Sequence, residues 1–325
     1  MHKKIIAIFA LTFSLSHFLF AVTDAELNAS FETLRENFFY SYTDSLLQHS
    51  LSADSYIGKL RPALPPHFST SLSFAGSFID TKLFRNAGEL LIEAMTSGEE
   101  GKAKPFSLNI PKALPLPTYA LSVRLGGILL PYDFGLYASI LPLKDKSAKD
   151  FLFTYDTWNV GTDIRFALFQ GNEVAPKISL GFGYIYSHFH FGVSGKKNYK
   201  GKSGGDFTAE GFLDMNVKTN THTIFAQLQV SKKFVFFTPY LGTRAILHIA
   251  ETSYDYAVKR TVTSGTATNQ AKSNSSTMEP ALEKIQAHIY AGFALNIRAF
   301  EMTLGANYNP MHNLFSVNFS FAYKQ

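Results

Sequence analysis

The C-terminal stretch LFSVNFSFAYK, Leu314 to Lys324, has the clearest strand pattern in this chain. Every second residue in it is large and apolar, and these residues are Phe315, Val317, Phe319, Phe321 and Tyr323. The residues between them are small or polar. Because a strand points alternate side chains to opposite faces, this segment has one aromatic, apolar face and one small, polar face. The apolar face must lie against either a protein core or a lipid bilayer.

The N-terminus has the pattern of a secretory signal peptide. MHKK is basic, residues 5–20 are mostly apolar, and Ala21 is a small residue at the expected cleavage point. An uncleaved membrane helix is the alternative, but Ser14, Ser16 and His17 interrupt a run that is already short for a bilayer span. We therefore expect residues 1–21 to be removed and the remainder to be exported.

The composition narrows the class of protein further. The chain has no cysteine, which excludes disulfides, thiolate chemistry and cysteine-based metal sites. Its net charge of +5 falls to about +3 without Lys3 and Lys4, and this is too mild to indicate nucleic-acid binding. Aromatic residues make up 15% and charged residues only 17%, where a soluble domain has about 25% charged residues. No later apolar run is long enough for a transmembrane helix, so this composition favours a membrane β-barrel.

Ten segments repeat with the period of two seen at the C-terminus. They cover residues 68–79, 116–128, 132–143, 152–169, 176–194, 219–232, 234–250, 284–298, 300–309 and 313–324. Their second face carries Gly, Ser, Asn, Gln and Arg, whereas a β-sandwich buries apolar residues inside and keeps polar residues outside. Most are also longer than the five or six residues of an ordinary strand. We predict an all-β membrane protein, an antiparallel transmembrane β-barrel of about ten strands, with eight to twelve strands left open.

The predicted connections alternate in length, as they do in outer-membrane barrels, where periplasmic turns are short and outer loops are longer. LLPYD, GNEVAP, SKKF and the junction near Ala299 are short and fall on one side. The charged stretch LKDKSAKD and the polar stretches 192–220 and 251–283 fall on the other side, where we predict loops. PMHN is the one short connection on that outer side. An even number of strands places both ends of the barrel in the periplasm.

The chain ahead of the barrel reads as helix and linker, so we divide it into a signal peptide (1–21), a periplasmic helical segment with a Pro-rich linker (22–66) and the barrel (67–325). Thr23 and Glu26 fit a helix capping box, and apolar residues then recur every three or four positions from Leu27 to Leu46. Because an amphipathic helix is marginal when alone in water, something must cover its apolar stripe. We favour a plug in the lumen, ahead of packing beneath the barrel or docking a partner. A second amphipathic helix is predicted at 81–96.

On these features the sequence resembles outer-membrane β-barrel proteins of diderm bacteria, over the signal peptide and roughly residues 116–325. The segment VNFSFAYK is similar to their C-terminal assembly signal, which implies such a role for Phe315, Val317, Phe319, Phe321 and Tyr323. It departs from that pattern because Tyr323 is followed by Lys324 and Gln325, where the family generally ends on Phe. The N-terminal helices are similar in placement to those of uncharacterised barrels from spirochaetes and Bacteroidota. The resemblance implies barrel assembly machinery, periplasmic chaperones and outer-membrane lipids, including lipopolysaccharide-type lipids, as partners.

The candidate functional residues are those predicted to line the lumen: Arg124, Asp133, Asp163, Arg165, Gln227, Arg244, Lys284, His288 and Arg298. Inward charges either set the selectivity of an open pore or form a salt-bridge network that fills a narrow barrel. His188 and His190 share a strand face, but we find no third ligand for zinc and interpret them as rim histidines. We expect no cofactor and no metal. Outward aromatic residues such as Trp158 and Tyr184 are candidates for the interfacial girdles.

Three functions remain for such a barrel. A narrow porin-like channel for small solutes or ions is the first, and a closed barrel whose surface loops bind a partner is the alternative. An enzyme at the rim is third, because no adjacent Asp-Asp or His-Asp pair and no phosphate-binding loop is present. We therefore expect a protein that is not an enzyme. The oligomeric state and the solute are not encoded in any pattern we recognise.

Overall fold

The computed structural model describes residues 40–53, 67–80, 113–127, 132–148, 151–172, 174–202, 206–263, 270–282 and 285–325. Within them lie a helix at 40–47, the short 3-10 helix η1 (Gln48–Ser50) and eleven strands. The strands are β1 (His67–Asp80), β2 (Ala113–Gly126), β3 (Tyr132–Ala148), β4 (Phe151–Phe169), β5 (Lys177–Lys202), β6 (Asp206–Ser231), β7 (Phe237–Thr263), β8 (Gln270–Leu282), β9 (Gln286–Ile297), β10 (Phe300–Asn309) and β11 (Leu314–Lys324). The signal peptide, the Pro-rich linker and the predicted helix at 81–96 lie outside the described residues.

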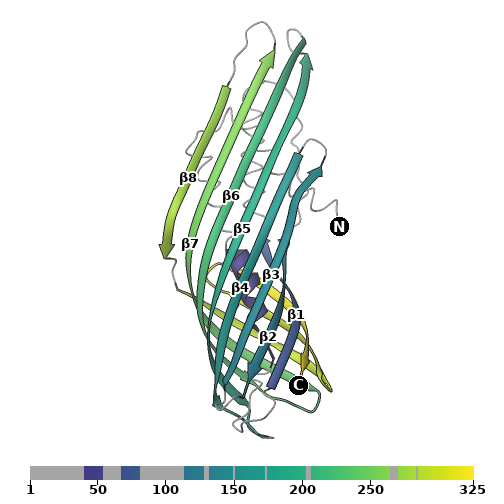
Figure 1. Ribbon diagram of the computed structural model, residues 1–325, viewed down its shortest axis with the longest axis vertical. Helices are drawn as coiled ribbons and strands as arrows, with labels where there is room; N and C mark the ends of the chain where they lie inside the picture. Colours follow the sequence, from purple (N-terminus) through teal and green to yellow (C-terminus); the bar gives the residue numbers. More distant parts are fainter. Residues whose placement is uncertain are drawn as a thin grey trace.

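The strands form a closed antiparallel barrel with ten strand positions (Figure 1). Strands β1 to β7 pair in chain order, followed around the ring by β9, β10 and β11, and β11 pairs with β1 to close it. β8 and β9 share one position because both pair with β7: β9 pairs with residues 237–246 and β8 with residues 249–260. The predicted ten-stranded barrel is therefore confirmed, and closure leaves no strand edge exposed in the ring.

The two ends of the barrel differ. At one end, called here the short-turn end, β2–β3, β4–β5, β6–β7 and β9–β10 are joined by few residues. The other end is called the hairpin end. The whole strands β5, β6 and β7 are 26, 26 and 27 residues long, and at this end they extend with β8 far beyond β1 and β11 (Figure 1). The predicted loops at 192–220 and 251–283 are therefore wrong, because most of these residues are paired strand. LKDKSAKD is also not a loop, since β3 continues through a register shift to Ala148.

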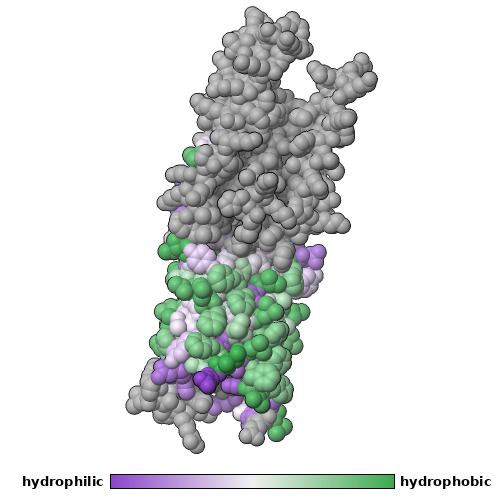
Figure 2. Space-filling model, turned by 90° about the vertical axis from the view of Figure 1, so that its right-hand side faces the viewer, coloured by the Kyte–Doolittle hydropathy of each residue, from purple (hydrophilic) through white to green (hydrophobic). Residues whose placement is uncertain are grey.

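The outward face of the barrel is apolar over the height that all ten strand positions share. Its exposed large residues include Leu72, Phe74, Leu121, Leu136, Val160, Phe182, Ile224, Leu228, Leu241, Ile289, Leu304, Phe319 and Phe321. On the face that Figure 2 shows, a hydrophobic band lies above a hydrophilic lower rim. In water such a surface would be strongly unfavourable, whereas in a bilayer it matches the hydrocarbon. The fold is therefore that of a transmembrane β-barrel.

Among the described residues, no helix has the length and apolarity needed to cross a bilayer.

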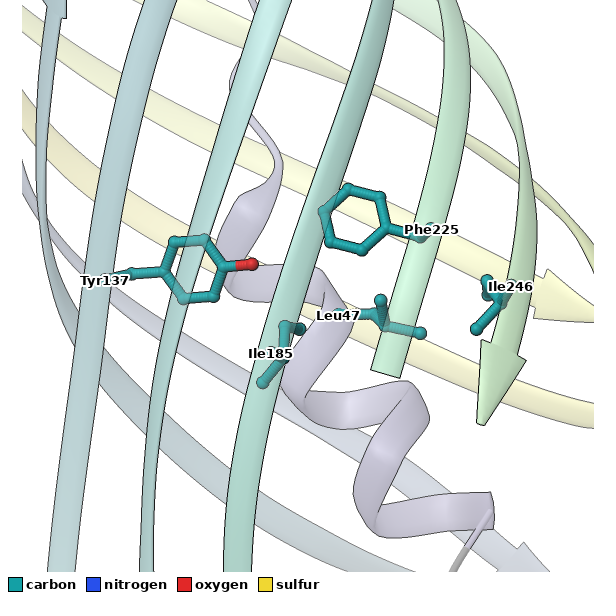
Figure 3. Packing of buried hydrophobic residues seen from close by; sticks show 5 residues of the cluster. All are labelled: Leu47, Tyr137, Ile185, Phe225 and Ile246. Atoms are coloured by element: carbon teal, nitrogen blue, oxygen red, sulfur yellow. The ribbon is translucent and has the colours of Figure 1, made fainter. Parts of the chain in front are cut away.

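The helix at 40–47 lies inside the barrel (Figure 1). Leu47 is fully buried among inward side chains of four strands, namely Tyr137, Ile185, Phe225 and Ile246 (Figure 3). Further along, Leu51 and Ala53 pack with Tyr240, Tyr290 and Ala294. Of the apolar stripe predicted from Leu27 to Leu46, Tyr42 and Leu46 are buried inside the barrel, and the part before residue 40 lies outside the described residues.

Candidate functional site: the filled lumen

Residues 40–53, called here the lumen segment, are held by hydrogen bonds to many strands of the barrel. Ser45 Oγ lies 2.7 Å from Thr118 Oγ1 on β2, and Gln48 donates to Ser316 Oγ on β11 at 3.0 Å. The ring nitrogens of His49 lie 2.7 Å from Ser73 Oγ and 2.9 Å from Thr118 Oγ1. These small hydroxyl side chains are what the sequence places on the inward face. They leave room for the segment and give its polar groups partners in a place that water does not fill.

Arg244 on β7 is the central cation of this contact. Its guanidinium donates to the backbone carbonyl of Leu47 at 3.0 Å, to Ser50 Oγ at 2.8 Å and to Gln227 Oε1 at 2.8 Å. The rings of Phe225 and Tyr290 lie 4.8 and 5.3 Å from its Cζ atom. Arg244 is only 2% exposed. A buried guanidinium needs acceptors, and the lumen segment supplies two of the three described here.

A second charged group lies nearer the short-turn end. Arg124 on β2 makes a bidentate pair with Asp163 on β4, with N–O distances of 3.0 and 2.9 Å. Arg165 donates its Nε–H to the same carboxylate at 3.0 Å and also donates to the backbone carbonyl of Ser50. Two cations therefore share one buried carboxylate, and one of them also bonds to the lumen segment. This is a structural network of the kind that fills a narrow barrel.

A third polar contact involves the carboxylate of Asp44 in the lumen segment. Its Oδ1 lies 3.4 Å from His288 Nε2 on β9, with both side chains fully buried. Asn307 on β10 contacts the other ring nitrogen of His288 at 3.3 Å. The lumen segment therefore places its one described acidic side chain against the wall of β9 and β10.

Aromatic rings lie flat along the inner wall where the neighbouring strand has glycine. A Cβ atom at Gly161 would overlap the ring of Tyr137, and one at Gly183 would overlap the ring of Phe225. In each case the glycine and the aromatic residue are direct cross-strand partners. The missing side chain is what allows the ring to lie across the adjacent strand, where it contributes to the wall around Leu47.

The structure places most of the predicted lumen residues on the inward face. Asp133, Asp163, Arg165, Gln227, Arg244 and His288 are buried there, and Arg124 is partly exposed in its pair with Asp163. Arg298 is a correction. It lies exposed in the β9–β10 turn with φ of +56°, so it does not line the lumen. Lys284 lies outside the described residues.

The aromatic face of the opening stretch points away from the lumen. In β11 the large residues Phe315, Phe319, Phe321 and Tyr323 are exposed, Val317 is half-buried, and Ser316, Asn318 and Ser320 are buried inside. Trp158, Tyr184 and Tyr186 are also outward. The side chain of His188 lies 2.7 Å from Asn220 Oδ1 on the same outer surface. Across the part of the chain that the structure describes, no cluster of three metal-ligating side chains occurs.

Sequence reasoning missed several residues that hold the lumen segment. Gln229 donates to the carbonyls of Ser52 and Ala53 at 2.9 and 3.2 Å, yet a single polar residue on an inward face gives no indication of such a role. Phe225, Ile185 and Ile246 are apolar on the inward face and break the alternation. The pairing of an inward glycine with an aromatic residue on the next strand, as at Gly161 and Gly183, is the pattern that could have identified Tyr137 and Phe225.

Comparison with known proteins gives one family and a set of distant structures. The family model described as Lsa36-like matches residues 119–324. The comparison with curated proteins found no match. Similar solved structures include the autotransporter NalP translocator domain of Neisseria meningitidis, with 8% identity, 92% of this chain and 97% of that one covered, and a TM-score of 0.34. Ail of Yersinia pestis has 9% identity and a TM-score of 0.24, with 80% of this chain and 99% of that one covered. LpxR of Salmonella typhimurium has 10% identity and a TM-score of 0.25, with 78% of this chain and 99% of that one covered.

Proposed function

The chain belongs to the Lsa36-like family, and we propose that it is an outer-membrane β-barrel, sealed by its own lumen segment, that binds a partner through the strands that extend beyond the membrane. The main support for a sealed lumen is that the lumen segment buries the inward side chains of the surrounding strands. Arg165 and Gln229 are 0% exposed and Arg244 is 2% exposed, and each donates to the segment. In a water-filled pore these side chains would face solvent.

The proposed orientation places the short-turn end in the periplasm and the hairpin end outside the cell, as in other outer-membrane barrels. Export through the predicted signal peptide, and insertion by periplasmic chaperones and the barrel assembly machinery, belong to this proposal. The outward aromatic residues of β11 then serve in assembly and lie against lipid.

The extended strands are the proposed binding surface. Above His188, β5 continues for roughly 15 residues, which at about 3.4 Å per residue is on the order of 50 Å of strand. β6, β7 and β8 continue beside it. A solute channel has no need of a paired sheet of this length beyond the bilayer, whereas a partner-binding protein does.

The binding role can be tested with cells of a diderm host that display the protein. We expect these cells to adhere to cultured epithelial monolayers, used here as the probe surface. A variant in which short turns replace residues 192–216 and 253–280 keeps the ten spans, and its adhesion should fall to that of cells without the protein. Equal adhesion of the full and shortened forms, at equal surface amounts, would contradict the binding role.

A porin-like channel is the second candidate, and the polar nature of the contact around the lumen segment favours it. The described contacts between the segment and the barrel are mostly hydrogen bonds. Its buried apolar contacts come from Leu47, Leu51, Ala53 and few others. A segment held in this way can leave without exposing a large apolar surface. Because the inward cations Arg124, Arg165, Arg244 and Lys324 outnumber the inward acids Asp133, Asp163 and Glu301, the opened lumen would favour anions.

Planar-bilayer recording of the refolded wild-type protein separates the two candidates. The sealed barrel should give no current above that of an empty bilayer, with insertion verified by heat-modifiable gel mobility of the same sample. Stepwise currents from the unmodified protein would favour the porin-like channel, and their anion selectivity would support the charge argument.

A further inference from the structure

The contacts of the lumen segment with β1 show the direction in which this segment runs. β1 begins at His67 at the short-turn end and rises toward the hairpin end. Ser77, near the far end of β1, donates to the carbonyl of Ser41, whereas Ser73, four residues earlier on the same face, contacts His49. As the lumen segment proceeds along the chain, its partner on β1 therefore moves down toward the short-turn end.

Contacts with β4 give the same direction independently. β4 runs the opposite way to β1, descending from Phe151 to Phe169 at the short-turn end. Tyr42 bonds to Thr157 in the upper part of β4, and Ser50 accepts a hydrogen bond from Arg165 in the lower part. The lumen segment is thus parallel to β4 and antiparallel to β1.

The two ends of the segment lie at opposite mouths of the barrel. The ring of Tyr40 stacks on His312 in the β10–β11 turn at the hairpin end, with centroids 3.7 Å apart. The carbonyls of Ser52 and Ala53 are bonded to Gln229, which is two residues from the end of β6 at the short-turn end. The segment therefore crosses the barrel from mouth to mouth, with its N-terminal end at the hairpin end.

We propose that the chain preceding Tyr40 leaves the barrel at the hairpin end, so that it is presented on the cell surface rather than in the periplasm. This replaces the expectation of a periplasmic location for the whole of residues 22–66. It also gives the barrel a further activity, because the lumen is then the route by which this part of the chain crosses the membrane. Which mouth faces outward rests on the orientation proposed above, but the crossing itself rests only on the order of contacts.

The cysteine-free chain allows a direct test with single-cysteine variants on intact cells. Ser30→Cys and Ser55→Cys form a matched pair on either side of the lumen segment. Met311→Cys marks the hairpin end and Lys233→Cys marks the short-turn end, since both native side chains are exposed there. Each variant is labelled with a membrane-impermeant maleimide before and after the outer membrane is permeabilised, and its folding is verified by heat-modifiable mobility.

We expect Ser30→Cys to be labelled under the same condition as Met311→Cys, on intact cells, and Ser55→Cys to be labelled with Lys233→Cys, only after permeabilisation. The difference between the two conditions should exceed about tenfold for Ser55→Cys and be absent for Ser30→Cys. Labelling of Ser30→Cys together with Lys233→Cys would overturn the inference. Protection of Met311→Cys on intact cells would contradict the proposed orientation. Even then, labelling of Ser30→Cys under the same condition as Met311→Cys would support the passage of the chain through the lumen.

A protease site inserted after Ser30 gives a second readout that does not depend on thiol reactivity. Protease added to intact cells should cleave this site and leave the barrel whole. A site that resists protease on intact cells but is cleaved after permeabilisation would place this part of the chain in the periplasm and contradict the inference.

Discussion

Arg244 on β7 donates a hydrogen bond of 3.0 Å to the backbone carbonyl of Leu47, which lies 197 residues earlier in the chain. This bond joins the wall of the barrel to the segment inside it. Leu47 is the last residue of the helix at 40–47, and the last carbonyls of a helix have no N–H partner within the helix, so this carbonyl accepts from Arg244 and from Ser50 Oγ. The end of the helix and the burial of the arginine therefore depend on each other.

Replacing this arginine should loosen the seal. Arg244→Ala removes two bonds to the lumen segment, and one bond from a charged donor contributes about 1.5–3 kcal/mol. The two bonds together contribute about 3–6 kcal/mol, so we expect the ratio of open to sealed barrels to rise roughly 10²- to 10⁴-fold, seen as intermittent current steps in planar bilayers. Arg244→Lys keeps the charge and one donor and should open less often. If neither variant gave current above that of an empty bilayer, Arg244 would not be the residue that holds the lumen segment in place.

The carboxylate of Asp163 should matter more for folding than for sealing. Asp163→Asn leaves Arg124 and Arg165 close together without their shared anion, and breaking a buried ion pair costs about 3–5 kcal/mol. Urea unfolding of the refolded protein in liposomes, followed by the fluorescence of the single tryptophan, Trp158, measures this loss. The double variant Asp163→Asn/Arg124→Gln should recover part of it. A loss below 1 kcal/mol for Asp163→Asn would contradict the network.

The pairing of glycine with an aromatic ring predicts a clash that can be relieved. Gly161→Ala places a methyl group where the ring of Tyr137 lies, and such overpacking typically costs about 1–3 kcal/mol. We expect the same unfolding measurement to show this loss. In the Tyr137→Ala background the added methyl group should have almost no further effect. An equal loss in both backgrounds would mean that the ring of Tyr137 does not lie across Gly161.

The lipid-facing position of Phe319 predicts an effect that depends on depth. Phe319→Arg lies midway along β11 and should destabilise the barrel by roughly 2–4 kcal/mol, whereas a charge near the bilayer surface costs about 0–1 kcal/mol. Tyr323→Arg, near the end of the same strand, serves as the matched control. Heat-modifiable mobility of the protein in isolated outer membranes reports assembly. Normal assembly of Phe319→Arg would reverse the assignment of the two faces.

The membrane-spanning strands could be predicted because the bilayer imposes one rule on every one of them. Each needs apolar residues outward and small or polar residues inward, so the period of two persists and the ten positions can be counted. That rule ends above the membrane. Between 192 and 220, Lys, Gly and Ser occur at both odd and even positions, so the period of two disappears. The backbones still pair with each other, which sequence periodicity does not report.

The interior was less accessible to sequence reasoning, although its polar character was clear. Arg165 and Arg244 could be identified as inward, but each also donates to a backbone carbonyl of the lumen segment, and a carbonyl has no signature in the sequence. Arg298 was misplaced because a turn with positive φ interrupts the alternation between β9 and β10. The direction of the lumen segment follows from pairs such as Ser41 with Ser77, which only the fold brings together.

Residues 40–53 fill the lumen, and a cross-link between positions 45 and 118 gives the sharpest test of this placement. Their oxygens lie 2.7 Å apart, so a Ser45→Cys/Thr118→Cys variant of this cysteine-free chain should form a disulfide in the outer membrane. The single-cysteine variants are the controls. We expect a gel-mobility shift that is reversed by reductant, in nearly all molecules and with normal barrel assembly. No cross-link under oxidising conditions, in a barrel that is otherwise assembled, would place the segment outside the lumen and contradict the account.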